Sequence, residues 1–149
     1  MENLDYTTTD LESPLAEVKA DICNLPFDSN TYDIIFCNHV LEHIPEDLKA
    51  MSELYRVLKP GGMAIVQIPL DRNRETTFED NSITDREERT RIFGQYDHVR
   101  VYGMDYFERL QSVGFEAHAV PYYEKLRTDE IDRYRLNPTE LLPIVYKPK

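Results

Sequence analysis

The sequence predicts an α/β domain built on a doubly wound, mostly parallel sheet. Four consecutive apolar residues at 34–37, within a strand expected over Tyr32–Asn38, are typical of a strand covered on both faces. A helical segment closed by Lys-Pro-Gly-Gly follows from Pro45 to Gly62, and a second apolar strand covers Met63–Ile68. A strand, a helix and a strand in this order predict a parallel βαβ unit with a right-handed crossover.

The helix expected after Pro45 has clear start and stop signals. Pro45 suits the first turn, and the acids at 46 and 47 suit the positive end of the helix dipole. Pro60-Gly61-Gly62 predicts where the helix ends. Spacings of three and four residues predict one apolar stripe, made of Leu48, Met51, Tyr55 and Leu58.

Two short strands are expected before this unit, over Leu4–Thr9 and Val18–Ile22. Only about seven residues separate them, which is too few for a crossover helix. Either the connection is irregular or one of the two strands is wrongly assigned.

Residues 71–100 are polar and charged, with little apolar periodicity. Thr84 and Glu87 have capping-box spacing, which predicts a short helix over Asp85–Ile92. A segment of this length between a strand and the next helix indicates a lid or a substrate-binding insertion.

The C-terminal third predicts four further elements. An amphipathic helix over Asp105–Val113 ends at Gly114, and a charged helix is expected over Thr128–Leu136. Two strands are expected, over Phe115–Pro121 and Leu142–Tyr146.

Length and composition indicate one domain over residues 1–149. The net charge of −11 argues against a nucleic-acid or anionic-lipid partner. No apolar run approaches the roughly 20 residues of a membrane span, and the N-terminus has no signal-peptide pattern. Cys23 and Cys37 lack metal-ligand spacing, so we expect reduced, buried thiols and a cytoplasmic protein.

Candidate ligand-binding residues follow the expected strands, because ligands of open parallel sheets bind beyond the carboxyl ends of the strands. An acid at Asp10 can accept hydrogen bonds from ribose hydroxyls, and Asp21 can accept from an adenine amino group. Asn38 ends the central strand, where it can face an ammonium or sulfonium group. Each has a structural alternative: a turn stabilised by the aspartate side chain for the two acids, and a helix N-cap for Asn38.

The order of these motifs resembles the methyltransferase type 11 family, a group of class I S-adenosylmethionine (SAM) dependent methyltransferases. Tyr6 to about Pro69 carries the strong part of the resemblance, and Val99–Phe115 a looser part. The matching runs are Asp21-Ile-Cys-Asn-Leu-Pro-Phe, Tyr32-Asp-Ile-Ile, Val40-Leu-Glu-His43 and Leu54-Tyr-Arg-Val-Leu-Lys-Pro-Gly-Gly62.

The resemblance implies a Rossmann-like methyltransferase fold and SAM as cofactor. It implies that Asp10 and its neighbour Leu11 bind the ribose, and that Asp21 and Ile22 contact adenine. Asn38 and His39 would line the methionine end. In that reading the protein transfers a methyl group to a small-molecule acceptor.

One family feature is missing from the sequence. Members open with a strand and a glycine-rich turn, but all five glycines here are at Gly61 or later. We therefore expect a methyltransferase domain truncated at the N-terminus; a partner chain that supplies the strand, or a rearranged domain without cofactor, are the alternatives. An inactive scaffold or dimerisation module is thus the second functional hypothesis, and a dinucleotide-binding oxidoreductase a weaker third. An open sheet edge favours homo-oligomers.

Acceptor-binding residues are expected in the stretch 95–100. His98 is the candidate catalytic base, with Tyr96 and Arg100 as binding groups. A packing role is the alternative for His98 and the favoured one for His43. Tyr122 and Tyr123 are expected in the core rather than in an acceptor pocket.

Overall fold

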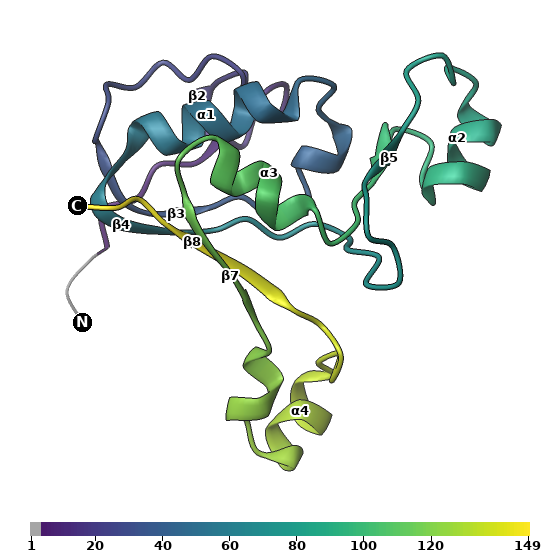
Figure 1. Cartoon of the computed structure of the whole chain (residues 1–149). Coiled ribbons are helices and arrows are strands. Elements are labelled where there is room, and N and C mark those ends of the chain that lie inside the picture. Colours follow the sequence, from purple (N-terminus) through teal and green to yellow (C-terminus); the bar gives the residue numbers. More distant parts are fainter. Residues whose placement is uncertain (1–3) are drawn as a thin grey trace.

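A computed structural model of the chain, which describes residues 4–149, contains one four-stranded sheet and two two-stranded ones. The four-stranded sheet has the order β3-β4-β8-β7 (Figure 1). Its strands are β3 (Tyr32–Phe36), β4 (Leu58–Ile65), β7 (Glu116–Val120) and β8 (Leu142–Tyr146). β3 and β4 are parallel, as the βαβ prediction requires, whereas β8 runs antiparallel to both β4 and β7. The α/β class is confirmed.

The two N-terminal strands are shorter than expected. β1 (Thr9–Asp10) pairs in parallel with β2 (Val18–Lys19) in a sheet of their own. The stretch from Leu4 to Thr8 is not a strand, so the strand predicted over Leu4–Thr9 is wrong except at its last residue. The seven residues between β1 and β2 form turns without a helix, which confirms the irregular connection.

Helix α1 (Asp47–Val57) connects β3 to β4, after a single 3-10 turn η1 (Leu41–His43). The predicted apolar stripe is wrong in part. Leu48 is 43% exposed, and the buried positions of the helix are Asp47, Ala50, Met51, Leu54 and Val57. Most buried positions of α1 therefore come one residue earlier in the sequence than the predicted stripe.

Strand β4 begins at Leu58, earlier than the predicted Met63, so Pro60-Gly61-Gly62 lies inside the strand rather than before it. The pairing of β4 with β3 shifts register between Tyr32 and Ile34, which accommodates this turn as a bulge. Gly61 has φ +79°, and a Cβ at Gly62 would lie 3.0 Å from the Asp33 carbonyl oxygen. The two glycines thus allow β3 to approach the bulge closely.

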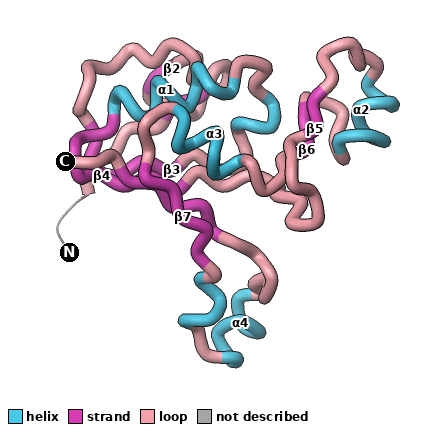
Figure 2. The backbone as a smooth tube through the Cα atoms, viewed as in Figure 1, coloured by secondary structure: helices cyan, strands magenta, loops and turns pink. Residues whose placement is uncertain are grey.

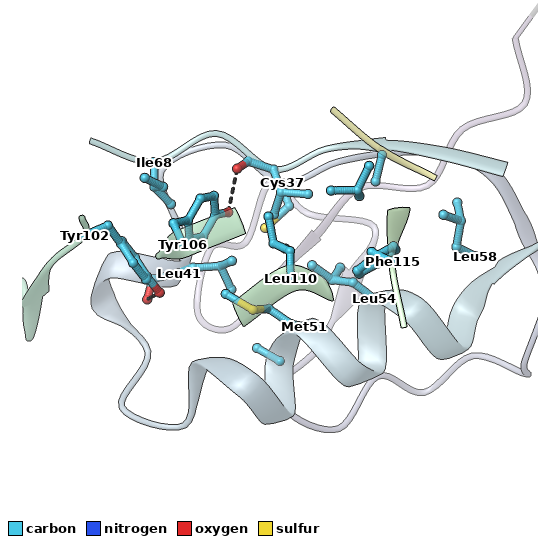
Figure 3. Packing of buried hydrophobic residues seen from close by; sticks show 14 residues of the cluster. Cys37, Leu41, Met51, Leu54, Leu58, Ile68, Tyr102, Tyr106, Leu110 and Phe115 are labelled. Atoms are coloured by element: carbon cyan, nitrogen blue, oxygen red, sulfur yellow. Dashed lines mark hydrogen bonds between the residues drawn. The ribbon is translucent and has the colours of Figure 1, made fainter. Parts of the chain in front are cut away.

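One face of the sheet is covered by α1 and by α3 (Tyr106–Ser112) (Figures 1 and 3). Strand residues on that face, such as Ala64, Val66 and Val145, are fully buried. The Tyr106 hydroxyl donates to the Val66 carbonyl at 2.7 Å (Figure 3). The core includes Cys37, Leu41, Met51, Leu54, Leu58, Ile68, Tyr102, Tyr106, Leu110 and Phe115.

The opposite face of β3 is open in the part of the chain that the structure describes. Ile34 is 54% exposed and Phe36 is 69% exposed. The expectation of a strand covered on both faces is therefore wrong here. β3 also pairs on one side only, with β4, among residues 4–149.

Residues 71–100 form an appendage beside the sheet (Figure 2). It contains α2 (Arg86–Phe93) and β5 (Phe78–Glu79), which pairs antiparallel with β6 (Arg100–Val101). The predicted helix exists, but its N-cap is Asp85, whose carboxylate accepts from the Glu88 N–H at 2.9 Å. The capping box predicted from Thr84 and Glu87 is therefore wrong by one residue.

The C-terminal predictions are confirmed with small changes of boundary. β7 and β8 form a long hairpin arm whose far end carries η2 (Tyr122–Lys125) and α4 (Thr128–Tyr134) (Figure 1). Tyr122 is 49% exposed and Tyr123 is partly buried, so the predicted core role of these tyrosines is wrong. No helix within residues 4–149 is both long enough and apolar enough to cross a membrane.

Candidate functional site

Asp10 ends β1 and Asp21 lies two residues after the adjacent parallel strand β2, and both side chains stabilise local turns. Asp10 Oδ1 accepts from the backbone N–H groups of Ser13 at 2.7 Å and Glu12 at 2.8 Å. These hydrogen bonds hold the pKa of Asp10 below its usual value, so the carboxylate is ionised. Asp21 Oδ1 accepts from the Cys23 N–H at 2.8 Å. Both acids, and Leu11 beside the first, are exposed to solvent, and Ile22 is partly buried.

The loop after Asp21 is anchored on α1 by the two motifs that carry the family resemblance. The Arg56 guanidinium donates to the carbonyls of Phe27 at 2.7 Å and Leu25 at 2.9 Å. It also pairs with Glu53, which accepts from the Leu25 N–H at 2.8 Å. The Leu-Pro-Phe run thus packs against the part of α1 that carries the Leu-Tyr-Arg-Val run. These hydrogen bonds hold the loop that begins at Asp21.

Asn38 and His39 lie just beyond the carboxyl end of β3, and both are exposed. The His39 N–H donates to the Gln67 carbonyl at 2.8 Å, and its backbone has φ +56°. A β3-to-η1 turn in this left-handed conformation directs the chain away from the sheet.

An open pocket of ≈ 390 Å³ lies at the carboxyl ends of β3 and β4. Ile68 and Pro69, which follow β4 by three and four residues, line it together with His39. Residues 137–141 form the far wall, and Arg72 donates to the Thr139 carbonyl at 2.6 Å. The pocket therefore lies where ligands of open α/β sheets bind.

The residues predicted to bind an acceptor do not line this pocket. Tyr96 is 47% exposed and lies under the Arg86 guanidinium, 4.1 Å from its ring centroid. His98 is 8% exposed, and Arg100 is 2% exposed. The structure thus places two of the three in the interior.

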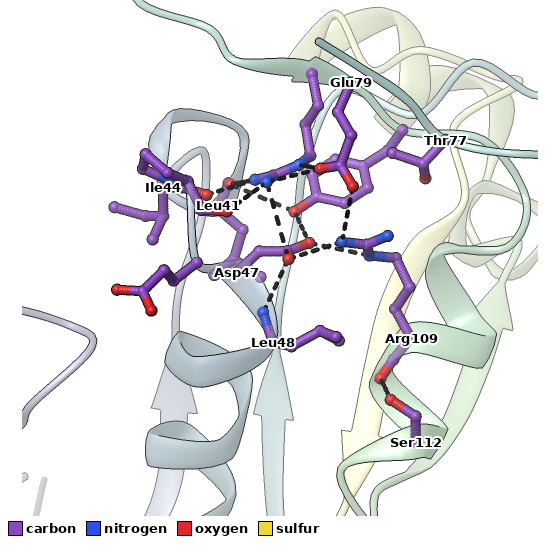
Figure 4. A network of polar contacts seen from close by, with 12 residues as sticks. Leu41, Ile44, Asp47, Leu48, Thr77, Glu79, Arg109 and Ser112 are labelled. Atoms are coloured by element: carbon purple, nitrogen blue, oxygen red, sulfur yellow. Dashed lines mark hydrogen bonds and ion pairs between the residues drawn. The ribbon is translucent and has the colours of Figure 1, made fainter. Parts of the chain in front are cut away.

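Arg100 belongs to a buried polar network (Figure 4). Its guanidinium donates to the Leu41 and Pro45 carbonyls at 2.9 Å and, through Nε, to Glu79 at 3.0 Å. Asp47, 2% exposed, accepts from Arg109 at 2.7 and 3.0 Å and from the Tyr102 hydroxyl at 2.8 Å. Arg100 therefore holds the η1–α1 junction against residues 79–109 rather than facing an open site.

The sequence did not point to the 137–141 wall of the pocket. Asn137 and Thr139 form a local turn, in which the Asn137 side chain accepts from the Thr139 N–H at 3.0 Å. Glu140 contacts the Gln67 side chain at the end of β4. The run Asn-Pro-Thr predicts a turn, but the hairpin arm that carries it back to β4 is visible only in three dimensions.

Comparisons with known proteins bear on the family and on the fold. The family described as "Methyltransferase domain" matches residues 2–66. A demethylmenaquinone methyltransferase from Staphylococcus epidermidis is 46% identical over 48 residues, which are 32% of this chain and 20% of that protein. A 2-phytyl-1,4-naphtoquinone methyltransferase from Nostoc punctiforme is 40% identical over 52 residues, 35% of this chain and 23% of that protein. The chain therefore spans only about a fifth of the length of the curated relatives that it matches.

Solved structures resemble the chain over most of its length. A protein from Bacillus halodurans superimposes with a TM-score of 0.54 at 18% identity, covering 88% of this chain and 71% of that one. A SAM-dependent methyltransferase from Thermotoga maritima has a TM-score of 0.51 at 17% identity, and the match covers 89% of this chain and 63% of that one. The fold is that of the Rossmann-like class I methyltransferases. The family match covers residues 2–66, so this part of the chain is similar to the methyltransferase domain family.

Proposed function

We propose that the protein transfers a methyl group from SAM to a small-molecule acceptor. The observation that carries this proposal is the family match over residues 2–66 together with Asp10 and Asp21, which lie at the carboxyl ends of the adjacent parallel strands β1 and β2. The carboxyl ends of parallel strands point to one edge of a sheet, so the two acids share an edge.

The residues present fit the adenosine half of SAM. Asp10 is exposed and ionised, and it would accept from the ribose hydroxyls, with Leu11 beside it. Asp21 would accept from the adenine amino group, with Ile22 near the ring. Asn38 and His39 would hold the methionine half, since both are exposed beyond the end of β3. Bound SAM would supply an electrophilic methyl group on its sulfonium.

The acceptor would enter the pocket between His39 and residues 137–141. Its ≈ 390 Å³ suits a small molecule. Asp71 and Arg72 line it at the start of the 71–100 segment, which supports a lid or binding role for that segment. His39 is the histidine that lines the pocket, and its side chain is 57% exposed. It is therefore our candidate to take a proton from a hydroxyl or amine acceptor.

The names of the relatives do not fix the acceptor. Demethylmenaquinone is the acceptor named for the Staphylococcus protein, but the matched stretch covers 20% of that protein. Methyl transfer needs the acceptor in line with the sulfonium, so positioning by the pocket walls decides the substrate.

A scaffold that has lost cofactor binding is the alternative, and one observation favours it. Within residues 4–149, β1 and β2 form a sheet separate from β3. Cofactor binding distinguishes the two functions.

Calorimetric titration of the chain with SAM and with its demethylated product tests the proposal. We expect binding that Asp10→Asn and Asp21→Asn weaken about tenfold or more, because an amide removes charge and one acceptor but keeps the turn-forming Oδ1. Asp80→Asn is the matched control, since Asp80 also accepts from a backbone N–H two residues on, at 2.9 Å, in an exposed turn. An absence of binding, or equal loss in the control, would favour the scaffold.

A further inference from the structure

Three potential metal ligands from two distant segments meet beside η1. Glu42 and His43 belong to η1, and His98 precedes β6. One ligand atom of each lies within 4.8 Å of the others. The Val99 N–H donates to the Glu42 carbonyl at 3.0 Å, so backbone contacts hold the two segments together. The cluster is thus part of the folded framework.

Glu42 is a buried acid with an unsatisfied oxygen. Its side chain is 2% exposed, and Oε1 lies 3.4 Å from His39 Nδ1. Oε2 is buried and has no hydrogen-bond partner in the described part of the chain. Burying an unpaired carboxylate oxygen is costly, and native structures almost always pair such groups. A cation bound by Oε2 would satisfy it.

The two histidines have one nitrogen each available to a metal. His98 Nδ1 lies 3.2 Å from the Phe93 carbonyl. A carbonyl only accepts, so Nδ1 carries the proton and Nε2 keeps its lone pair. His43 Nδ1 lies 3.4 Å from Asp97 Oδ2, which favours the same tautomer. Metal-bound histidines in proteins are commonly oriented in this way by a carbonyl or a carboxylate.

The geometry of the two rings also fits a shared ion. Their centroids lie 4.7 Å apart with an interplanar angle of 81°. Two imidazoles bound to one ion at about 2.1 Å, with an N–metal–N angle between about 90° and 110°, have centroids about 4.5–5.2 Å apart. The observed spacing lies within this range.

We propose that Glu42, His43 and His98 bind a divalent transition-metal ion of the zinc type. Two imidazoles and one carboxylate favour such an ion over Mg²⁺ or Ca²⁺, which prefer all-oxygen sites. Three protein ligands leave a fourth position for water or another oxygen ligand. Asp97 and the Phe93 carbonyl orient the imidazoles. The site does not depend on SAM, so it stands or falls independently of the proposed function.

The first test uses the full chain, freed of metal by a chelator and titrated with Zn²⁺ and with Co²⁺. We expect one ion per chain, a rise in Tm with Zn²⁺, and visible Co²⁺ absorption of a four-coordinate site. Long-range proton–nitrogen NMR should show the Nε2 signals of His43 and His98 shifting with Zn²⁺, while His118 is unchanged. Failure of these two rings to respond in the wild-type chain would overturn the proposal, whatever the variants do.

Variants supply the second test. Glu42→Gln, His43→Gln and His98→Gln should each weaken Zn²⁺ binding about 100-fold or more, because even residues that orient a ligand commonly contribute 10–100-fold. His118→Gln is the matched control, since His118 is exposed on β7 and lies 3.0 Å from Glu116. We expect its affinity within threefold of the wild type. Equal losses in all four variants would show adventitious surface binding and would contradict the site.

Discussion

Removing the charge of Asp47 should destabilise the fold more than any nearby surface change. Asp47 is 2% exposed and lies between two guanidinium groups: Arg109 at 2.7 Å and Arg100 at 3.8 Å. In Asp47→Asn the side chain keeps its shape, but one carboxylate oxygen is replaced by an NH₂ group. That group is itself a donor, so it cannot accept the hydrogen bonds that Arg109 and Tyr102 donate to Asp47. Removing one partner of a buried ion pair costs about 3–5 kcal/mol. For a chain of this length, that corresponds to a Tm lower by about 10–15 °C.

Glu79→Gln is the matched comparison. Glu79 contacts the same two guanidinium groups, at 2.9 Å and 3.7 Å, but its side chain is 39% exposed. Water replaces much of what the variant loses, so we expect a cost below about 1 kcal/mol. Thermal and urea unfolding followed by circular dichroism measures both. The reasoning is refuted if Asp47→Asn lowers the Tm by no more than Glu79→Gln.

Two further predictions concern the thiols and the open strand. Burial raises the pKa of the Cys37 thiol to about 12, so at pH 8 a thiol reagent should label partly buried Cys23 first and Cys37 only as the chain unfolds. Equal labelling of both thiols at pH 8 would contradict the burial of Cys37. Because the folded pKa of Cys37 lies above the unfolded value of 9.0, its contribution to the free energy of unfolding is complete below pH 9 and is lost between pH 9 and 12. Cys37→Ala should therefore reduce the loss of stability between pH 9 and 12. Phe36, 69% exposed on the unpaired strand β3, should promote self-association, so Phe36→Lys should lower the mass measured by light scattering; a monodisperse monomer for the wild type would contradict this.

The βαβ unit was predictable because its signals are local. A continuous apolar run and a charged first helical turn each act over a few residues. The Pro-Gly-Gly signal is also local, but it lies inside β4, and α1 ends three residues before it, at Val57. The buried face of α1 was not predictable at the same level. Tyr55 and Leu48 fit the period, but tertiary packing against α3 and β4 selects Ala50, Met51 and Leu54.

Exposure of β3 had no local signal either. Its sequence is that of a doubly covered strand, yet Ile34 and Phe36 are open among the described residues. A continuous apolar run predicts that both faces of the strand are covered, but in the described residues only one face of β3 is covered. The mismatch is the physical basis for the self-association prediction.

The candidate site was predictable only where neighbouring residues make it. Asp10 ends β1, and Asp21, Asn38 and His39 lie two or three residues beyond β2 and β3, so the strand pattern is enough to propose them. The cluster of Glu42, His43 and His98 depends on a backbone contact between η1 and the end of the 71–100 segment. Sequence reasoning therefore treated His98 as a candidate catalytic base, with a packing role as the alternative, and His43 as structural.

The residues proposed to hold SAM differ in how firmly the fold positions them. Asp21 belongs to a loop that Arg56 and Glu53 attach to α1, and His39 is attached to β4 through the Gln67 carbonyl. Asp10 is oriented by hydrogen bonds from its own turn, and β1 pairs only with β2 within residues 4–149. Placing Asp10 against a ribose would therefore require ordering that the other proposed contacts do not, and this cost would reduce the affinity for SAM. By the same linkage, SAM that contacts Asp10 and His39 together would join the two sheets and stabilise the chain.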